Sequence, residues 1–257
     1  MNNKGRDWIK RIVKRIATSS LLRPCGQTLL HAVQYILSIH HREVVSFSQP
    51  ERASVAERIR AIVTAWPPQT VGVEEAYQIR SGVLATAKLE GDIAEVGVFR
   101  GGTARVICEA KGDRQLHLFD TFEGLPEPGN ADAAFYKGQY ACSLESVREY
   151  LSGFPKVHFY EGYFPATGQP VKDRSFSFVH LDVDLCESTS QALEFFYPRM
   201  DPGGIIISHD YVAFPGVRNA FSEFFEYKPE PVVELIGNQC LVTKIGSRPA
   251  PLRGRAA

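Results

Sequence analysis

Apolar and polar positions follow two different patterns on either side of residue 90. Before it, apolar residues recur every three or four positions, which predicts helices over residues 29–37, 55–66 and 76–89. After it, short apolar runs alternate with helical patterns. The runs predict strands over residues 93–98, 115–119, 157–160, 176–181 and 205–208. The segments between them predict helices over residues 103–110, 144–151, 188–197 and 217–225.

This alternation predicts an α/β fold with a doubly wound parallel sheet that is covered by helices on both faces. Two last apolar runs, 232–236 and 240–244, are separated only by Gly237-Asn238-Gln239. Because the connection is so short, we expect a hairpin that ends the sheet with an antiparallel strand. The chain therefore divides into an N-terminal helical extension over 1–74, a sheet-containing domain over 75–246 and a flexible tail over 247–257.

Composition narrows the class of protein. With 29 basic and 29 acidic residues the formal net charge is +0, which gives no support to nucleic-acid binding. The five cysteines form no CxxC pair, so we expect neither a zinc site nor a disulfide framework. Such cysteine usage is typical of the reducing cytoplasm. No apolar run approaches the roughly 18–20 residues of a membrane span.

The first 25 residues are strongly basic and carry an apolar stripe. Trp8, Ile9, Ile12, Val13 and Ile16 recur at helical spacing, which predicts a basic amphipathic helix. One interpretation is a weak peripheral contact with the anionic inner face of a membrane, or with a partner. The interpretation that we favour is a stripe that packs on its own domain or on the second subunit of a homodimer.

A strand that ends in a glycine turn at the start of a helix is the first candidate for a binding site. The apolar run ends at Glu95 and Gly97, a loop carries Gly101 and Gly102, and the helix opens near Thr103. Such a turn lets the backbone approach a ligand closely. The spacing G-x-x-x-G-G is not the G-x-G-x-x-G of dinucleotide folds, and no lysine follows it as in a P-loop. An acid beside the turn suits a cationic ligand with an amino-acid tail, so we predict that these five residues bind S-adenosyl-L-methionine.

The acid that ends the second predicted strand is the next candidate. Asp120 follows the glycine turn by one strand–helix–strand unit. An acid in this position can accept hydrogen bonds from both ribose hydroxyls of a nucleoside. The alternative is an aspartate that caps the turn after it. We favour ribose binding.

Acidic residues gather after the fourth and fifth predicted strands. Asp182 and Asp184 are two apart and therefore face the same side of an extended chain. His209 and Asp210 follow the next run. If the two strands are neighbours, Asp182, His209 and Asp210 converge on a site that suits Mg²⁺, while the imidazole also tolerates Mn²⁺ or a heavier metal. The alternative is a set of turn-capping acids with a core histidine.

A divalent ion in that position would lower the pKa of a bound hydroxyl group and align its oxygen with a methyl donor. Asp184 is our first choice for the general base that removes the proton. His180 is a weaker candidate, because we expect it to point to the opposite face and into helix packing. The segment 127–139, rich in Pro, Gly, Asn and Asp, predicts a mobile loop that could exclude water as a lid.

Six short motifs follow one another in a fixed order. They are Glu-Val-Gly-Val-Phe-Arg-Gly-Gly-Thr (95–103), Phe-Asp-Thr-Phe-Glu-Gly-Leu-Pro (119–126), Leu-Asp-Val-Asp-Leu-Cys-Glu-Ser-Thr (181–189), Pro-Gly-Gly (202–204), His-Asp-Tyr (209–211) and Pro-Gly-Val-Arg-Asn-Ala (215–220). In this order they resemble the macrocin/mycinamicin-type O-methyltransferase family over roughly residues 75–245.

The resemblance implies a Rossmann-like class I methyltransferase fold, S-adenosylmethionine as methyl donor and dependence on Mg²⁺. It also implies methylation of a hydroxyl on a sugar, a glycan or a phenolic natural product. By the same route Asp182 and Asp210 would be metal ligands, Asp184 the base, and the loop 120–128 a cover for the cofactor. The chain departs from the family pattern at His209, where antibiotic-tailoring members carry the first of two consecutive acids. One negative charge fewer predicts a weaker affinity for Mg²⁺.

Two other functions compete with a metal-assisted O-methyltransferase. The first is methyl transfer to nitrogen or carbon without a metal, in which His209 and Asp210 are structural. The second is a non-catalytic module that holds S-adenosylmethionine or a nucleoside. Pure binding does not need the acid cluster of Asp182, Asp184 and Asp210, so we expect an enzyme.

Overall fold

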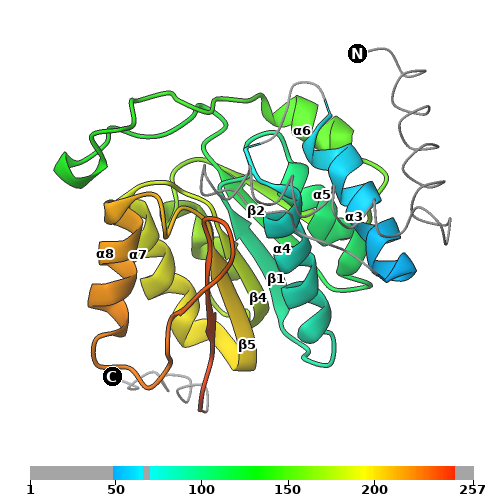
Figure 1. Ribbon diagram of the computed structural model, residues 1–257. Coiled ribbons are helices and arrows are strands. Elements are labelled where there is room, and N and C mark those ends of the chain that lie inside the picture. The colour runs from blue at the N-terminus through cyan, green and yellow to red at the C-terminus, as the bar shows by residue number, and fades with distance from the viewer. Residues whose placement is uncertain (1–48, 66–69, 247–257) are drawn as a thin grey trace, which may run out of the picture. The chain divides into compact units, whose positions relative to one another are not determined.

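The computed structural model describes residues 49–65 and 70–246. A compact unit that begins at Pro50 contains a seven-stranded sheet in the order β3-β2-β1-β4-β5-β7-β6 (Figure 1). The strands are β1 (Asp92–Val96), β2 (Leu116–Asp120), β3 (Val157–Glu161), β4 (Phe176–Leu181), β5 (Met200–Ser208), β6 (Val233–Glu234) and β7 (Cys240–Thr243).

The register of the sheet places the ends of its central strands side by side. β1 to β5 run parallel, with Val96 opposite both Phe119 and Leu181, and with Leu181 opposite Ser208. β7 is antiparallel to β5 and to β6. The expected doubly wound sheet with a terminal antiparallel hairpin is therefore confirmed, and the strand ends that carry the candidate residues meet at one edge.

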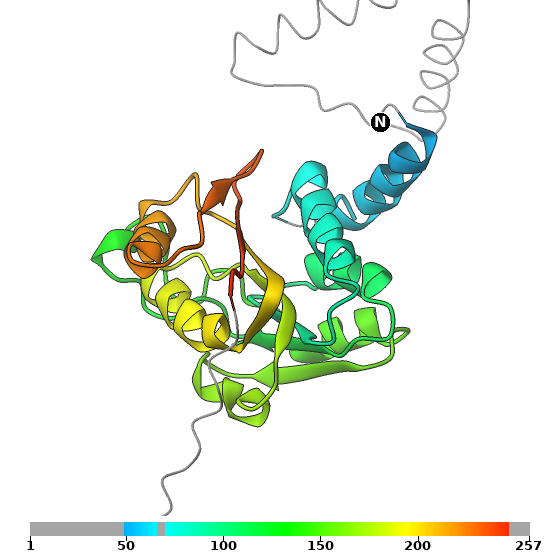
Figure 2. The same cartoon turned by 90° about the horizontal axis from the view of Figure 1, so that it is seen from below.

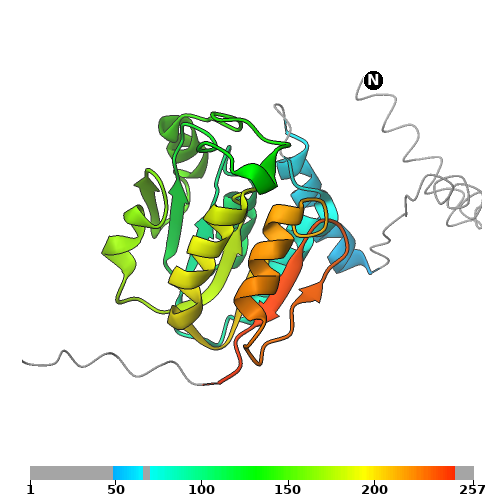
Figure 3. The same ribbon diagram turned by 90° about the vertical axis from the view of Figure 1, so that its left-hand side faces the viewer.

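Helices cover both faces of the sheet. α7 (Cys186–Phe196) and α8 (Pro215–Phe225) lie on one face (Figure 3). α4 (Val73–Ala85), α5 (Gly102–Ala110) and α6 (Leu144–Leu151) lie on the other, and α3 (Pro50–Val63) packs outside α4 and α5 (Figure 2). Three short 3-10 helices complete the described part, and they are η1 (Asn130–Asp132), η2 (Ala166–Val171) and η3 (Tyr197–Arg199).

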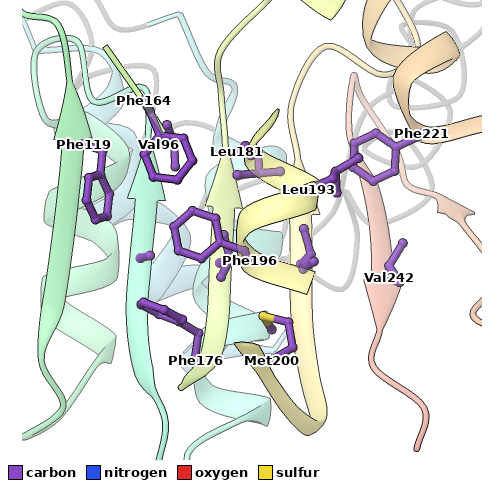
Figure 4. Close-up of a cluster of buried hydrophobic side chains, with 14 of the residues drawn as sticks. Val96, Phe119, Phe164, Phe176, Leu181, Leu193, Phe196, Met200, Phe221 and Val242 are labelled. Carbon is purple, nitrogen blue, oxygen red and sulfur yellow. The ribbon is translucent and has the colours of Figure 1, made fainter. Parts of the chain in front are cut away.

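A core rich in aromatic residues fixes α7 on the sheet (Figure 4). The ring of Phe196 on α7 lies 5.3 Å from the ring of Phe164 and 4.9 Å from that of Phe176 on β4. Stacked and edge-on ring pairs at these separations are favourable geometries. Burying one side chain of this size stabilises the fold by about 1.5–3 kcal/mol. The cluster thus holds β4 and α7 together.

Two boundaries near this core differ from the sequence prediction. β5 begins at Met200 rather than at 205, because the segment 201–204 stays extended although it carries no apolar side chain. Its backbone continues the ladder beyond β7, where Gly203 N–H donates to the Lys244 carbonyl. β6 is shorter than expected, with two residues instead of the run 232–236.

Some predictions fall where the structure gives no description. The helix over 29–37, the basic amphipathic helix of the first 25 residues and the tail over 247–257 lie outside the described residues. The division at 74/75 stays a prediction, and the compact unit that holds the sheet also includes α3. Among the described helices, none has the length and apolar character needed to cross a membrane.

Candidate active site

A cavity of about 360 Å³ opens where the central parallel strands end. Its walls come from the segments that follow each of the strands β1 to β5, including the long loop after β2, and from the turn between β6 and β7. Six of the residues predicted from the sequence line it, namely Gly97, Asp120, Asp182, Asp184, His209 and Asp210. Glu95, Gly101, Gly102 and Thr103 do not line it.

Gly97 is the point at which the β1 turn meets the segment after β4. Its φ is +84°, and a methyl group built on it would lie 2.6 Å from the carbonyl carbon of Asp182. Only glycine combines this left-handed conformation with so close an approach of two backbones. Asp182 is in turn held by its N–H, which donates to the carbonyl of Val96 at 2.9 Å.

Glu95 lies beneath the turn rather than in the cavity. Strand alternation points this side chain to the face opposite the neighbouring Val96, and its contact with the cofactor stays a prediction. Its carboxylate is 0% exposed and lies 2.8 Å from Nδ1 of His180, its register partner on β4. Burial raises the pKa of Glu95, while hydrogen bonds from His180 and from the Thr103 hydroxyl oppose the rise. His180 is itself fully buried.

The glycine pair after the turn begins α5. Gly101 is its N-cap residue with φ +76°, and it packs against Val147 of α6. Gly102 and Thr103 form the first turn of α5 and are buried. These residues therefore shape the loop that carries Gly97 but do not reach the cavity themselves.

Asp120 caps the turn that follows it, as one of the two interpretations expected, and ribose binding stays a prediction. One carboxylate oxygen accepts the N–H groups of Val98 at 2.7 Å and Phe99 at 2.9 Å, and the other accepts the N–H of Phe122 at 2.7 Å. The side chain therefore ties the β1 turn to the β2 turn. It also lines the cavity, where its remaining lone pairs are available to a ligand.

Asp182, His209 and Asp210 converge, with one ligand atom from each lying within 4.8 Å of the others. Nδ1 of His209 lies 3.2 Å from Oδ1 of Asp182 and 3.2 Å from Oδ1 of Asp210. On the other side of the ring, Nε2 lies 3.4 Å from Oε2 of Glu75. Glu75 comes from α4, and the sequence reasoning missed it, since its only local signal is a capping box with Gly72.

The charges of this cluster act strongly on one another. Burial alone would lower the pKa of His209, but the Asp182 carboxylate and the other two acids raise it well above its usual range. In return His209 holds the pKa of Asp182 below its ordinary value against the effect of burial. Burial together with the carboxylates of Asp182 and Asp210 raises the pKa of Asp184 to about 10. These acids are a set of oxygen donors with an excess of negative charge, which is what a divalent cation would neutralise.

The backbone around the cavity adopts uncommon conformations. Phe99, Tyr140, Asp184 and Asp210 all line it and have positive φ angles of +48°, +65°, +59° and +64°. Residues other than glycine rarely adopt this left-handed region of backbone conformation. Residues that do so are found especially often at functional sites.

The loop after β2, residues 121–141, is called the pocket loop below. Its stem closes through hydrogen bonds between Leu125 and both Gly138 and Gln139, at 2.8 Å each. At its tip, the Asp132 carboxylate accepts the Cys186 N–H at the start of α7. Leu125 and Tyr140 from the stem line the cavity, whereas no residue of the described segment 127–139, which was predicted as a lid, is part of its wall.

The sequence pattern of the macrocin O-methyltransferase (TylF) family matches residues 12–236, most of the chain. The chain belongs to this family. The family expected from the sequence motifs is confirmed, and with it the expectation of an O-methyltransferase at the level of the family.

The named relatives of the chain are O-methyltransferases as well. One relative is the 8-demethyl-8-(2,3-dimethoxy-alpha-L-rhamnosyl)-tetracenomycin-C 4'-O-methyltransferase of Streptomyces olivaceus, which is 35% identical in the matched region. That region covers 52% of this chain and only 58% of the relative. The demethyldecarbamoylnovobiocin O-methyltransferase of Streptomyces niveus is 29% identical over 72% of this chain and 78% of the relative. The solved structure of the O-methyltransferase NovP superposes with a TM-score of 0.63 at 26% identity, over 74% of this chain and 88% of that one.

Proposed function

We propose that this protein is an S-adenosylmethionine-dependent O-methyltransferase, assisted by a divalent metal, that acts on a hydroxyl of a sugar, glycan or natural product. One observation carries the proposal. A single cavity joins Gly97 and Asp120, which suit a nucleoside cofactor, to the cluster of Asp182, His209 and Asp210. Family membership supports the reaction class, and the names of the two relatives support the class of acceptor.

The cofactor would occupy the side of the cavity formed by β1 and β2. Asp120, whose carboxylate is fixed by three backbone N–H groups, would accept a hydrogen bond from a ribose hydroxyl at the acceptor position that these bonds leave free. The bare backbone at Gly97 would leave room for the amino-acid part of the cofactor. Glu95 would act from below, by fixing the end of β1 through His180.

The donor set of Asp182, His209 and Asp210 fits a divalent cation. Two carboxylates and one imidazole supply ligands of the kind that Mg²⁺, Mn²⁺ and heavier ions use, and the three lie close enough to share one ion. Bound there, the ion would lower the pKa of an acceptor hydroxyl and help to orient it.

Asp184 is the group that would receive the proton. It lines the cavity beside Asp182 and Asp210, which together with burial raise its pKa to about 10, so a divalent cation bound there would have to lower this pKa before Asp184 accepts the proton. The acceptor oxygen forms a bond to the methyl carbon, the carbon–sulfur bond breaks with its electron pair going to sulfur, and the hydroxyl proton goes to Asp184. The products are a methyl ether and S-adenosylhomocysteine.

A metal-independent methyl transfer is the second candidate, and one observation favours it. His209 lies in contact with three carboxylates, so its protonated ring alone could balance part of their charge. In that case the cluster would bind the acceptor through its carboxylates, without an ion.

Calorimetric titration of the full chain with S-adenosylmethionine, with and without Mg²⁺ or Mn²⁺, separates these functions. The leading proposal expects micromolar cofactor binding, a metal-dependent heat that is lost in an Asp182→Ala variant, and methylation of sugar hydroxyls that a chelator abolishes. Turnover that survives the chelator would instead support the metal-independent enzyme. Absence of cofactor binding would contradict both.

A further inference from the structure

The imidazole of His209 is enclosed by acids from three different elements. Asp182 follows β4, Asp210 follows β5, and Glu75 lies near the start of α4 on the far side of the ring. The side chains of His209 and Glu75 are only 8% and 9% exposed. Nε2 of His209 has no hydrogen bond of regular geometry within the described residues, and the Glu75 carboxylate at 3.4 Å faces it. This buried nitrogen therefore has an acid in position to accept its proton.

The Glu75 carboxylate is itself held firmly. Oε2 accepts the N–H of Gly72 at 2.7 Å, and Oε1 accepts the N–H of Asn238 at 2.7 Å. A methyl group on Gly237, whose φ is +93°, would lie 2.7 Å from Oε1. The Asn238 side chain also donates to Oδ1 of Asp210 at 2.6 Å. The turn between β6 and β7 thus connects Glu75 with the cluster on the other side of the imidazole.

This arrangement makes the two nitrogens of His209 different. A carboxylate that accepts Nε2–H favours the tautomer whose free lone pair is on Nδ1. Nδ1 is the atom that faces Asp182 and Asp210 at 3.2 Å. When a metal ion replaces the proton that Asp182 and Asp210 favour on Nδ1, the lone pair would point to the place where the ion shares these two carboxylates, and the Glu75 carboxylate would make the imidazole a stronger donor.

We propose that Glu75 is a positioning residue that turns His209 into a metal ligand through Nδ1, and that the pair shifts the preference of the site from Mg²⁺ toward transition-metal ions. Mg²⁺ prefers oxygen ligands, whereas imidazole binds ions such as Co²⁺ and Ni²⁺ more readily. The inference deepens the proposed metal assistance and rests on it.

The test measures metal binding directly, apart from turnover. Wild-type protein, Glu75→Gln, Glu74→Gln and His209→Asp are titrated with Co²⁺ by visible absorption and with Mg²⁺ by calorimetry. Glu74 is the matched control, because it is the neighbouring acid on α4 and has no contact with the histidine. Unfolding curves and S-adenosylmethionine titration without metal confirm that each variant is folded.

We expect Glu75→Gln to weaken Co²⁺ binding about 10–100-fold, while Glu74→Gln leaves it unchanged. His209→Asp should lower the ratio of Co²⁺ to Mg²⁺ affinity, and adding Glu75→Gln to it should change Co²⁺ binding little. Long-range ¹H–¹⁵N spectra of the wild type should place the histidine proton on Nε2 when Co²⁺ is replaced by diamagnetic Zn²⁺. Metal binding that is equal in wild type and Glu75→Gln would overturn the role of Glu75. Absence of metal binding in the wild type would instead contradict the metal assistance itself.

Discussion

Gly97 and Gly203 form a matched pair for testing the close approach that builds the site. Their φ angles are nearly equal, +84° and +80°, so an alanine at either position meets the same backbone strain. Their surroundings differ. A methyl group on Gly203 would have no atom within 4 Å, whereas one on Gly97 would lie 2.6 Å from the carbonyl carbon of Asp182. That separation is well inside the ordinary carbon–carbon contact of about 3.5–4.0 Å.

The size of each effect follows from these two observations. A non-glycine residue in the left-handed region costs roughly 1–2 kcal/mol, and the more restricted unfolded chain offsets about 0.4–1 kcal/mol of this. Gly203→Ala should therefore lose about 1 kcal/mol of unfolding free energy. Gly97→Ala should lose about 1–3 kcal/mol more than that, because Asp182 must move although its N–H is bonded to Val96.

Urea unfolding followed by circular dichroism gives both free energies, provided that the slopes agree between the variants. Calorimetry on the same samples should show S-adenosylmethionine binding lost in Gly97→Ala and kept in Gly203→Ala. If the two variants lose equal stability and both bind the cofactor, the close contact between the β1 turn and Asp182 does not exist in solution, and the site as described here is incorrect.

Three further predictions concern the base, the pocket loop and the far end of the sheet. Asp184→Asn should keep cofactor binding and lower kcat about 10²–10⁴-fold, and unchanged turnover would remove Asp184 from the reaction. Asp132→Ala should lower the unfolding free energy by about 1 kcal/mol, as the loss of a helix cap does, and should speed proteolysis within the pocket loop. An unchanged cleavage rate would argue against the hydrogen bond from the Cys186 N–H to Asp132 as the anchor of this loop. Burial would raise the pKa of Glu230, but hydrogen bonds from Tyr197 and Lys244 hold it below its ordinary 4.5. The stabilisation by this carboxylate is therefore complete above pH 4.5 and is lost as the pH falls through the pKa of the folded state. Urea unfolding should show that Glu230→Gln lowers the unfolding free energy by about 1.5–3 kcal/mol at pH 7 and by clearly less at pH 3.5.

The elements of the fold could be predicted wherever apolar side chains mark them. The strand over 176–181 and the helix over 144–151 have the bounds that the pattern predicts, because each buries a regular set of apolar residues. The start of β5 could not be predicted, since the backbone of 201–204 pairs through hydrogen bonds that no side chain signals. Sequence periodicity reports side-chain burial, and it is silent where only the backbone takes part.

The candidate site could be predicted only as far as it depends on strand order. Parallel neighbours bring their carboxyl ends together, so Asp182 and His209 could be placed side by side once β4 and β5 were adjacent. For Glu95 the pattern gives its position on the strand but not what lies on each face, so its buried contact with His180 could not be predicted. Glu75 could not be found, because the way in which α4 packs on the sheet depends on tertiary contacts.

The position of Glu75 gives the histidine at 209 a physical reason. An aspartate there would add a carboxylate to a buried site that already holds Asp182, Asp210 and Glu75, and such like charges need a cation or a proton between them. An imidazole instead separates Glu75 from the other two acids and can interact with both sides at once. His209 and the acid on α4 are therefore best understood as one unit. The energetic coupling between Glu75 and His209 is measurable by a double-mutant cycle of Glu75→Gln and His209→Asp. Strict additivity of the two changes in unfolding free energy would contradict the argument.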